Sequence, residues 1–181
     1  MQVTLVVYVE DKPGVLNRVA SLCRRRGFNI ESLTVGHTDT PGLSRMTIVV
    51  SADEAGGRRL EAQLYKLINV RRVENITDAA AVVRDLAMVK VAATHDTRTH
   101  IMQLAETFRA RVVDVAPDSL VVEITGTEDK IDGLVDVLRP YGVLEMVRTG
   151  KVAMRRGTRT SRPAEKPVPD QPGADHVSYS V

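Results

Sequence analysis

One stretch of the sequence, Asp11 to Leu16, has the residue types of a small-molecule binding site. The amides of Gly14, Val15 and Leu16 are expected at the start of a helix, where unpaired N–H groups and the helix dipole bind anions. Gly14 has no Cβ, so the carboxylate of a ligand can approach its backbone closely. Asp11 lies just ahead and is suited to hold an ammonium group by a charge-assisted hydrogen bond. Together these groups predict a site for a free α-amino acid.

The same residues can also serve only the local structure, without binding a ligand. An Asp ahead of a helix is commonly an N-cap, and a glycine between a strand and a helix commonly serves the geometry of the turn. From the residues alone, this second interpretation is the more common of the two.

The elements around this stretch follow from hydrophobic periodicity. Apolar residues alternate from Val3 to Val9, which predicts a strand, and then recur at helical spacing from about Pro13 to Arg26. Further strands are expected at 28–38, 43–51 and 70–76, with a break at 52–57 and a second helix marked by Leu60, Leu64, Leu67 and Ile68. This order predicts an antiparallel sheet with both helices on one face, the ferredoxin-like βαββαβ arrangement.

The same order of elements repeats in the second half. After a linker at 79–85, strands are expected at 86–93, 112–116, 120–126 and 143–149, with helices around Ile101 to Phe108 and Ile131 to Leu138. Thr127 is the expected cap of the last helix. The fold class is therefore α+β, with two ferredoxin-like domains in tandem at 1–78 and 79–157. Residues 158–181 contain four Pro and little apolar periodicity, so we expect a disordered C-terminal tail.

Composition excludes several classes of protein. The single cysteine, Cys23, excludes a disulfide within one chain, and its place on the apolar stripe of the first helix predicts burial. No signal sequence or membrane-spanning apolar run is present, so we expect a cytoplasmic protein with no membrane association. Seven Lys and Arg against three Asp and Glu lie in 148–181, a basic excess that is most commonly solvated.

Catalytic signals are missing from the sequence. The four histidines never fall at metal-ligand spacing with carboxylates, and there is no glycine-rich phosphate loop or nucleophile elbow. The strands offer no suitably placed aromatic residues for binding RNA. We therefore expect no active site, no metal and no cofactor in this chain, and no nucleic-acid partner.

Several stretches carry a resemblance to a known family. They are Glu10 to Leu16, Arg25 to Leu33 and Leu43 to Ile48, then Phe108 to Ala110, Asp114 with Val115, Gly126 with Lys130, Pro140 to Gly142 and Glu145 to Gly150. In this order, over about residues 2–157, the chain resembles the small regulatory subunit of acetolactate (acetohydroxyacid) synthase. Pro13 to Leu16 alone would indicate only an ACT domain, an amino-acid-sensing module.

The resemblance implies a function. The first domain would be an ACT domain that forms a homodimer, and the chain would bind a catalytic subunit that carries thiamine diphosphate, magnesium and FAD. It would raise the activity of that subunit and make it sensitive to valine, in the biosynthesis of valine, leucine and isoleucine. The effector would lie between two ACT domains, with its carboxylate at the loop Gly14 to Leu16 and Asn29 reaching across from the partner. The implied effector-binding residues are Asp11, Gly14, Val15, Leu16, Asn29 and Ile30.

Two other functions stay open from the sequence. One is a stand-alone, amino-acid-responsive ACT regulator that acts on nucleic acid or on another enzyme. It is weakened because the basic tail has no aromatic or helical pattern beside its Arg residues. The other is an independent enzyme, which the lack of a catalytic constellation opposes. One departure from the family pattern also matters, because Asp11 stands where several relatives have Asn and so changes the charge beside the effector.

Overall fold

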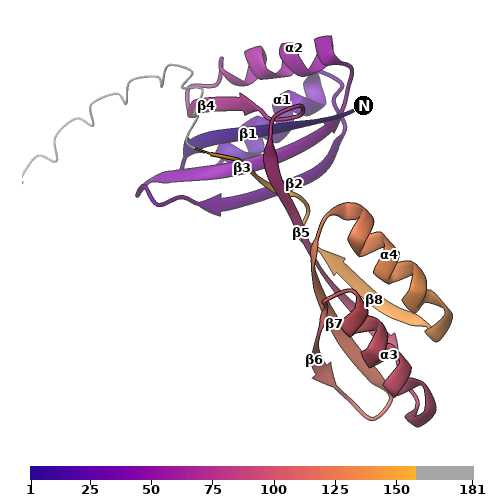
Figure 1. Cartoon of the computed structure of the whole chain (residues 1–181). Helices are drawn as coiled ribbons and strands as arrows, with labels where there is room; N and C mark the ends of the chain where they lie inside the picture. Colours follow the sequence, from indigo (N-terminus) through magenta and orange to yellow (C-terminus); the bar gives the residue numbers. More distant parts are fainter. Residues whose placement is uncertain (158–181) are drawn as a thin grey trace, which may run out of the picture.

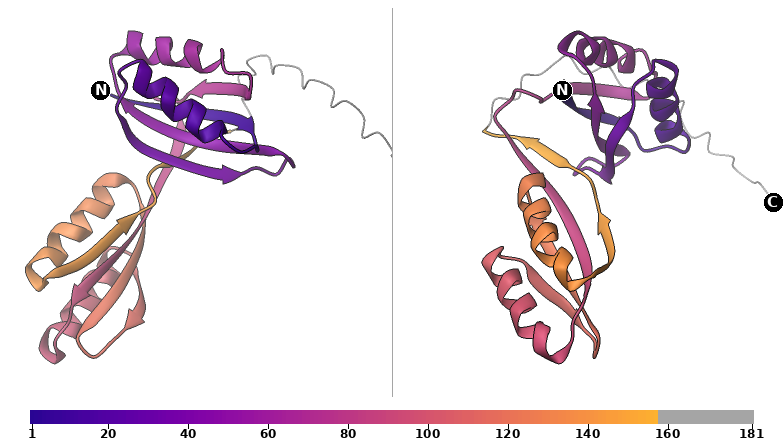
Figure 2. Two further views of the ribbon diagram at one scale, coloured as in Figure 1. Left: turned by 180° about the vertical axis from the view of Figure 1, so that it is seen from behind. Right: turned by 90° about the vertical axis from the view of Figure 1, so that its right-hand side faces the viewer.

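The computed structural model describes residues 1–157, which form two α+β units (Figure 1). The first unit contains β1 (Gln2–Glu10), α1 (Val15–Arg25), β2 (Ile30–His37), β3 (Leu43–Ser51), α2 (Glu54–Leu64) and β4 (Val70–Asn75). Its strands pair antiparallel in the order β2-β3-β1-β4. Helices α1 and α2 cover one face of this sheet (Figure 2). The predicted ferredoxin-like arrangement is confirmed.

Alternation along β1 places its side chains in two environments. The odd-numbered residues from Val3 to Val9 are buried against the helices, beside Val19 and Cys23 of α1. Each aliphatic side chain buried in this way contributes about 1.5–3 kcal/mol. Val6 is buried on the opposite, helix-free face.

The second unit repeats the architecture. It contains β5 (Ala81–Ala92), α3 (His95–Thr107), β6 (Arg111–Val115), β7 (Ser119–Gly126), α4 (Glu128–Leu138), the 3-10 helix η1 (Arg139–Tyr141), β8 (Val143–Arg148) and β9 (Val152–Arg155). The sheet order is β6-β7-β5-β8, with α3 and α4 on one face (Figure 2). Thr127 is the N-cap residue of α4, although its side chain makes no capping hydrogen bond.

Helix α2 begins earlier than the sequence predicts, because the break expected at 52–57 is wrong. Asp53 is the N-cap, and its Oδ1 accepts from the Gly56 amide at 2.6 Å. Gly56 and Gly57 are both buried, and a Cβ at Gly57 would come within 3.0 Å of Val3. Gly57 lets α2 lie close to the sheet, and this packing outweighs the low helix propensity of glycine. The helix ends at Leu64, which leaves Ile68 exposed.

The linker expected at 79–85 is also largely wrong, because β5 begins at Ala81. The first part of β5, Ala81–Arg84, pairs with β9, a strand that the sequence does not predict. The remainder of β5 continues into the second sheet between β7 and β8. Figure 1 shows β5 running from one unit into the other.

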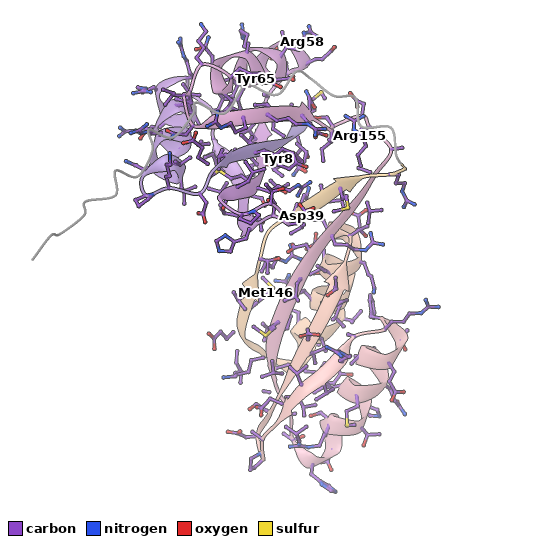
Figure 3. All side chains as sticks on the ribbon, turned by 90° about the vertical axis from the view of Figure 1, so that its left-hand side faces the viewer. Tyr8, Asp39, Arg58, Tyr65, Met146 and Arg155 are labelled. Carbon is purple, nitrogen blue, oxygen red and sulfur yellow. The ribbon has the colours of Figure 1, made fainter. Side chains whose placement is uncertain are left out.

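The ribbon of β5 and β9 packs on the helix-free face of the first sheet. Ala153 is buried with Val6 and Ile76, and the Arg45 guanidinium donates to the Ala153 carbonyl. Arg155 Nε lies 3.8 Å from Glu74 Oε2. Tyr8 and Arg155, labelled in Figure 3, line the same pocket at this contact. The two units are therefore joined by packing as well as by the chain.

The sequence also predicts that no segment spans a membrane and that the C-terminal tail is disordered. Within residues 1–157, no helix is long and apolar enough to cross a membrane. The tail expected to be disordered, 158–181, lies outside the described residues. The division of the chain at residue 78 stays a prediction.

Candidate functional site

Glu10 anchors the turn that leads from β1 to α1. Its carboxylate accepts from Asn69 Nδ2 at 2.8 Å and forms ion pairs with Lys12 and Arg71. The hydrogen bond from Asn69, together with the two cations, lowers the pKa of Glu10 below its ordinary value of 4.5. The next residue is fixed as well, because the Asp11 amide donates to the Gly42 carbonyl at 2.8 Å. The candidate site therefore begins on a firmly held strand end.

Gly14 is the N-cap of α1 and has a left-handed backbone, with φ 80°. Side chains with a Cβ rarely adopt this conformation, so the turn requires glycine for its geometry. The helix begins at Val15, not at Pro13, and Asp11 is not its N-cap. The structural interpretation of Asp11 is therefore wrong, whereas that of Gly14 agrees with the structure. The geometric role of Gly14 also leaves room for a ligand, because a Cβ at this position would meet no atom within 4 Å.

The backbone amides at the start of α1 are largely unpaired. Within residues 1–157, the amides of Gly14, Leu16 and Asn17 have no hydrogen-bond acceptor. The Val15 amide was expected to be free, but it donates to the Lys12 carbonyl at 3.4 Å, a long bond. The Val15 side chain is buried, and that of Leu16 is partly exposed. A helix start with unpaired N–H groups is suited to bind a carboxylate.

Asp11 has a neighbour that the sequence analysis missed. His37, the last residue of β2, places Nδ1 3.3 Å from Asp11 Oδ2. Both side chains are well exposed, His37 at 84% and Asp11 at 46%, so the pair is weak and open to exchange with a ligand. The sheet order could have shown this contact. β1 and β2 both pair antiparallel with β3, so they run in the same direction and finish at the same end of the sheet.

The remaining predicted site residues, Asn29 and Ile30, lie at the opposite end of the sheet. Ile30 is opposite Val50, which in turn is opposite Val3, whereas Glu10 is opposite Leu43. The two ends are seven residues apart along β1, about 23 Å at the usual rise of a strand. One chain therefore cannot bring Asn29 and Gly14 to the same small ligand.

The acidic, His and Cys side chains of the described residues are dispersed. Among residues 1–157, no group of three or more His, Cys, Asp and Glu side chains lies close enough to hold a metal ion. Cys23 is buried in the core, which raises the pKa of its thiol. The unpaired amides at the start of α1 and the exposed Asp11 carboxylate can bind a small polar ligand.

The fold and the turn define an ACT-type domain followed by a second domain of the same architecture. A family model described as "AHAS small subunit-like ACT domain" matches residues 5–72. A second model, described as "Small subunit of acetolactate synthase", matches residues 84–157.

Curated relatives and a solved structure agree with these matches. The chain is 52% identical to the probable acetolactate synthase small subunit of Archaeoglobus fulgidus, over 88% of this chain and 99% of the relative. It is 44% identical to the acetolactate synthase small subunit of Bacillus subtilis, over 93% and 98% of the two chains. The crystal structure of the acetolactate synthase small subunit from Thermotoga maritima superposes with a TM-score of 0.81 at 39% identity, covering 87% of this chain and 98% of that one.

The chain belongs to the acetolactate synthase small-subunit family. Membership of this family gives the chain a regulatory role beside a catalytic subunit.

Proposed function

We propose that this chain activates a thiamine-diphosphate-dependent acetolactate synthase subunit and makes it sensitive to valine. Membership of the small-subunit family supports the choice of partner. Thiamine diphosphate, magnesium and FAD belong to the catalytic subunit in this proposal, and this chain binds none of them. Its own ligand is valine or another branched-chain amino acid.

The observation that carries the proposal is the separation of the site residues into two groups at opposite ends of β2. β2 is an edge strand, with no strand paired to its outer side among the described residues. Two copies of β2 paired antiparallel would place the start of one strand beside the end of the other. Asn29 and Ile30 of one copy would then lie beside the turn from Asp11 to Leu16 of its partner. Homodimerisation thus completes the site.

The completed site matches the chemistry of a free apolar amino acid. The ligand carboxylate accepts from the unpaired amides of Gly14 and Leu16. The ammonium group is held by Asp11, where it displaces His37. The partly exposed side chains of Leu16 and of the partner's Ile30 provide apolar surface for a branched side chain.

The second unit makes the contact with the catalytic subunit in this proposal. Its helix-free face has exposed apolar side chains at the centre, where Met88 of β5 is opposite Val147 of β8. Met88 is 40% exposed and Val147 is 52% exposed. The ion pair of Lys90 with Glu145, 3.7 Å apart, lies beside them. An apolar centre with a polar border is the usual composition of a protein interface.

Valine acts by a shift of population in this proposal. By bridging two ACT domains it favours one arrangement of the dimer, and that arrangement supports the catalytic subunit less well. A ligand shifts such an equilibrium only by its difference in affinity for the two states, so partial inhibition is expected.

A reconstitution experiment tests the proposed function. The purified chain alone should form no acetolactate from pyruvate, and its addition to the catalytic subunit should raise turnover, which valine should then lower. If the chain alone formed acetolactate, or if the catalytic subunit were equally active with and without it, the proposal would be wrong.

A further inference from the structure

The end of β8 and the start of β9 are joined by Thr149 to Lys151, and this segment contacts β2 of the first unit. Ser32 Oγ accepts from the Lys151 amide at 2.9 Å. Thr34 Oγ1 donates to the Thr149 carbonyl at 3.3 Å. We call this contact, formed by Ser32, Thr34 and Thr149 to Lys151, the β2 junction. It connects residues more than a hundred positions apart in the chain.

Gly150 permits the close approach at the β2 junction. Its φ is +87°, a conformation that strains other residues. A Cβ at this position would lie 2.5 Å from Ser32 Oγ and 3.3 Å from Thr34 Oγ1. Any other residue must therefore displace the Ser32 hydroxyl from its present position as well as strain the backbone.

The other side of the segment is held by the second unit. Asp85 of β5 is buried, and its Oδ1 accepts from the Gly150 amide at 3.1 Å and from Thr149 Oγ1 at 3.0 Å. Lys151 Nζ lies 2.7 Å from Glu128, the first residue of α4, and 2.5 Å from Gln2 Oε1 of β1. The segment therefore links β2 to both β5 and α4.

The pairing of β2 is irregular next to the β2 junction. The register between β2 and β3 shifts between Ile30 and Ser32, which is a bulge at Glu31. Bulges leave one residue unpaired and redirect the strand. Glu31 and Leu33 line a pocket of about 300 Å³ beside the β2 junction, together with Arg148 and Lys151. The pocket leaves open space beside the β2 junction.

We propose that the β2 junction transmits effector binding from the ACT domain to the second domain, with Ser32 and Gly150 as positioning residues. This inference rests on the proposed function, in which the effector is held by Asn29 and Ile30. These residues are three and two positions ahead of Ser32 on the same chain segment, on the far side of the bulge. When the ligand fixes Asn29, the bulge adjusts, Ser32 moves relative to the Lys151 amide, and Asp85 and Glu128 carry the change into the second sheet and α4.

The test compares junction variants with matched controls in the reconstituted complex. Ser32→Ala removes the acceptor for the Lys151 amide, and Gly150→Ala displaces that acceptor through its Cβ. Ser119→Ala and Gly157→Ala are the controls, because Ser119 lies in a distant hairpin, and Gly157 shares the positive φ of Gly150 but a Cβ there meets no atom within 4 Å. The junction variants should bind valine, measured by calorimetry, within about twofold of the unaltered chain. The valine concentration for half-inhibition should rise about fivefold or more, or the maximal inhibition should fall by half, which are typical sizes of allosteric coupling.

Hydrogen exchange provides a readout that a merely structural role would not change. Valine should alter the exchange rate of the peptide covering Thr149 to Val152 in the unaltered chain and in both controls, but not in Ser32→Ala. Normal inhibition by valine in both junction variants would overturn the inference. If the unaltered chain itself bound no valine, the proposed function would fail instead, so the two failures are distinguishable.

Discussion

Asp11 Oδ2 and His37 Nδ1 lie 3.3 Å apart at the ends of two strands that are not neighbours in the sheet. The contact places an exchangeable imidazole beside the carboxylate that we assign to the ligand ammonium group. Asp11→Ala should therefore weaken valine binding about tenfold or more, the usual effect of losing a charged hydrogen bond. His37→Ala removes only a weak competitor, so affinity should stay within about threefold or increase. Calorimetric titration of both variants checks this, and a large loss of affinity in His37→Ala would assign the ligand contact to His37 instead.

A negative charge at position 14 should weaken valine binding more than backbone strain alone does. Gly14→Asp places a carboxylate where the ligand carboxylate lies, while Gly14→Ala adds only the Cβ and the strain of a positive φ, about 1–2 kcal/mol. Both variants should fold, because Gly14 is exposed and its Cβ would meet no atom within 4 Å. Titration should show a much greater loss of affinity in Gly14→Asp than in Gly14→Ala. Equal losses in the two variants would argue against a carboxylate at this position.

Stability should decrease in acid because of Glu10. Its pKa in the folded chain is lowered below 4.5, so ionised Glu10 stabilises the fold above that pH. The contribution is lost as the pH falls through the lowered pKa. Glu10→Gln should therefore be less stable than the unaltered chain at neutral pH, and the difference should narrow below pH 4.5, as measured by urea denaturation.

Glu54→Gln is the control for Glu10. Glu54 pairs with Arg58 on the exposed surface of α2, where an ion pair contributes little. Its replacement should leave the free energy of unfolding within about 0.5 kcal/mol at every pH. A difference between Glu10→Gln and the unaltered chain that did not change with pH would contradict the role assigned to ionised Glu10.

Activation should depend on the helix-free face of the second unit. Val147→Asp places a charge opposite Met88 at the centre of the proposed contact with the catalytic subunit. Activation should fall at least about tenfold, which is about 1.4 kcal/mol, because burying an unpaired charge in an apolar contact costs more than that, while valine binding persists. Met102→Asp, on the exposed side of α3, is the control and should activate normally. Full activation by Val147→Asp would exclude this face.

The fold could be predicted because each element carries its own period in the sequence. The spacing of apolar residues changes near Pro13, from every second residue in β1 to helical spacing in α1. The repeat of six elements follows from the same kind of local signal. Two regions could not be predicted because long-range packing decides them. Gly57 lies in a helix because α2 packs tightly against Val3, and β9 is a strand because it pairs with Ala81–Arg84.

The candidate site was predictable only in part, for a similar reason. Local sequence predicts a helix start near Pro13, and the structure has it two residues later, at Val15, with Gly14 as the N-cap. The neighbour of Asp11 depends on the order of strands, and the β2 junction depends on two segments more than a hundred residues apart. The assignment of Asp11, Gly14, Val15, Leu16, Asn29 and Ile30 to an effector stays a prediction.

The central claim is that one effector site is formed by two chains, because Gly14 and Asn29 lie at opposite ends of the same sheet. Mixing Gly14→Asp chains with Asn29→Ala chains tests it most directly. Neither variant should bind valine as a homodimer. In a mixed dimer, Gly14 of the Asn29→Ala chain meets Asn29 of the Gly14→Asp chain, so one of two sites is intact. Calorimetry on the purified mixed dimer should then show one valine per dimer at the affinity of the unaltered chain. Failure of the mixed dimer to bind valine would contradict a site shared between two chains.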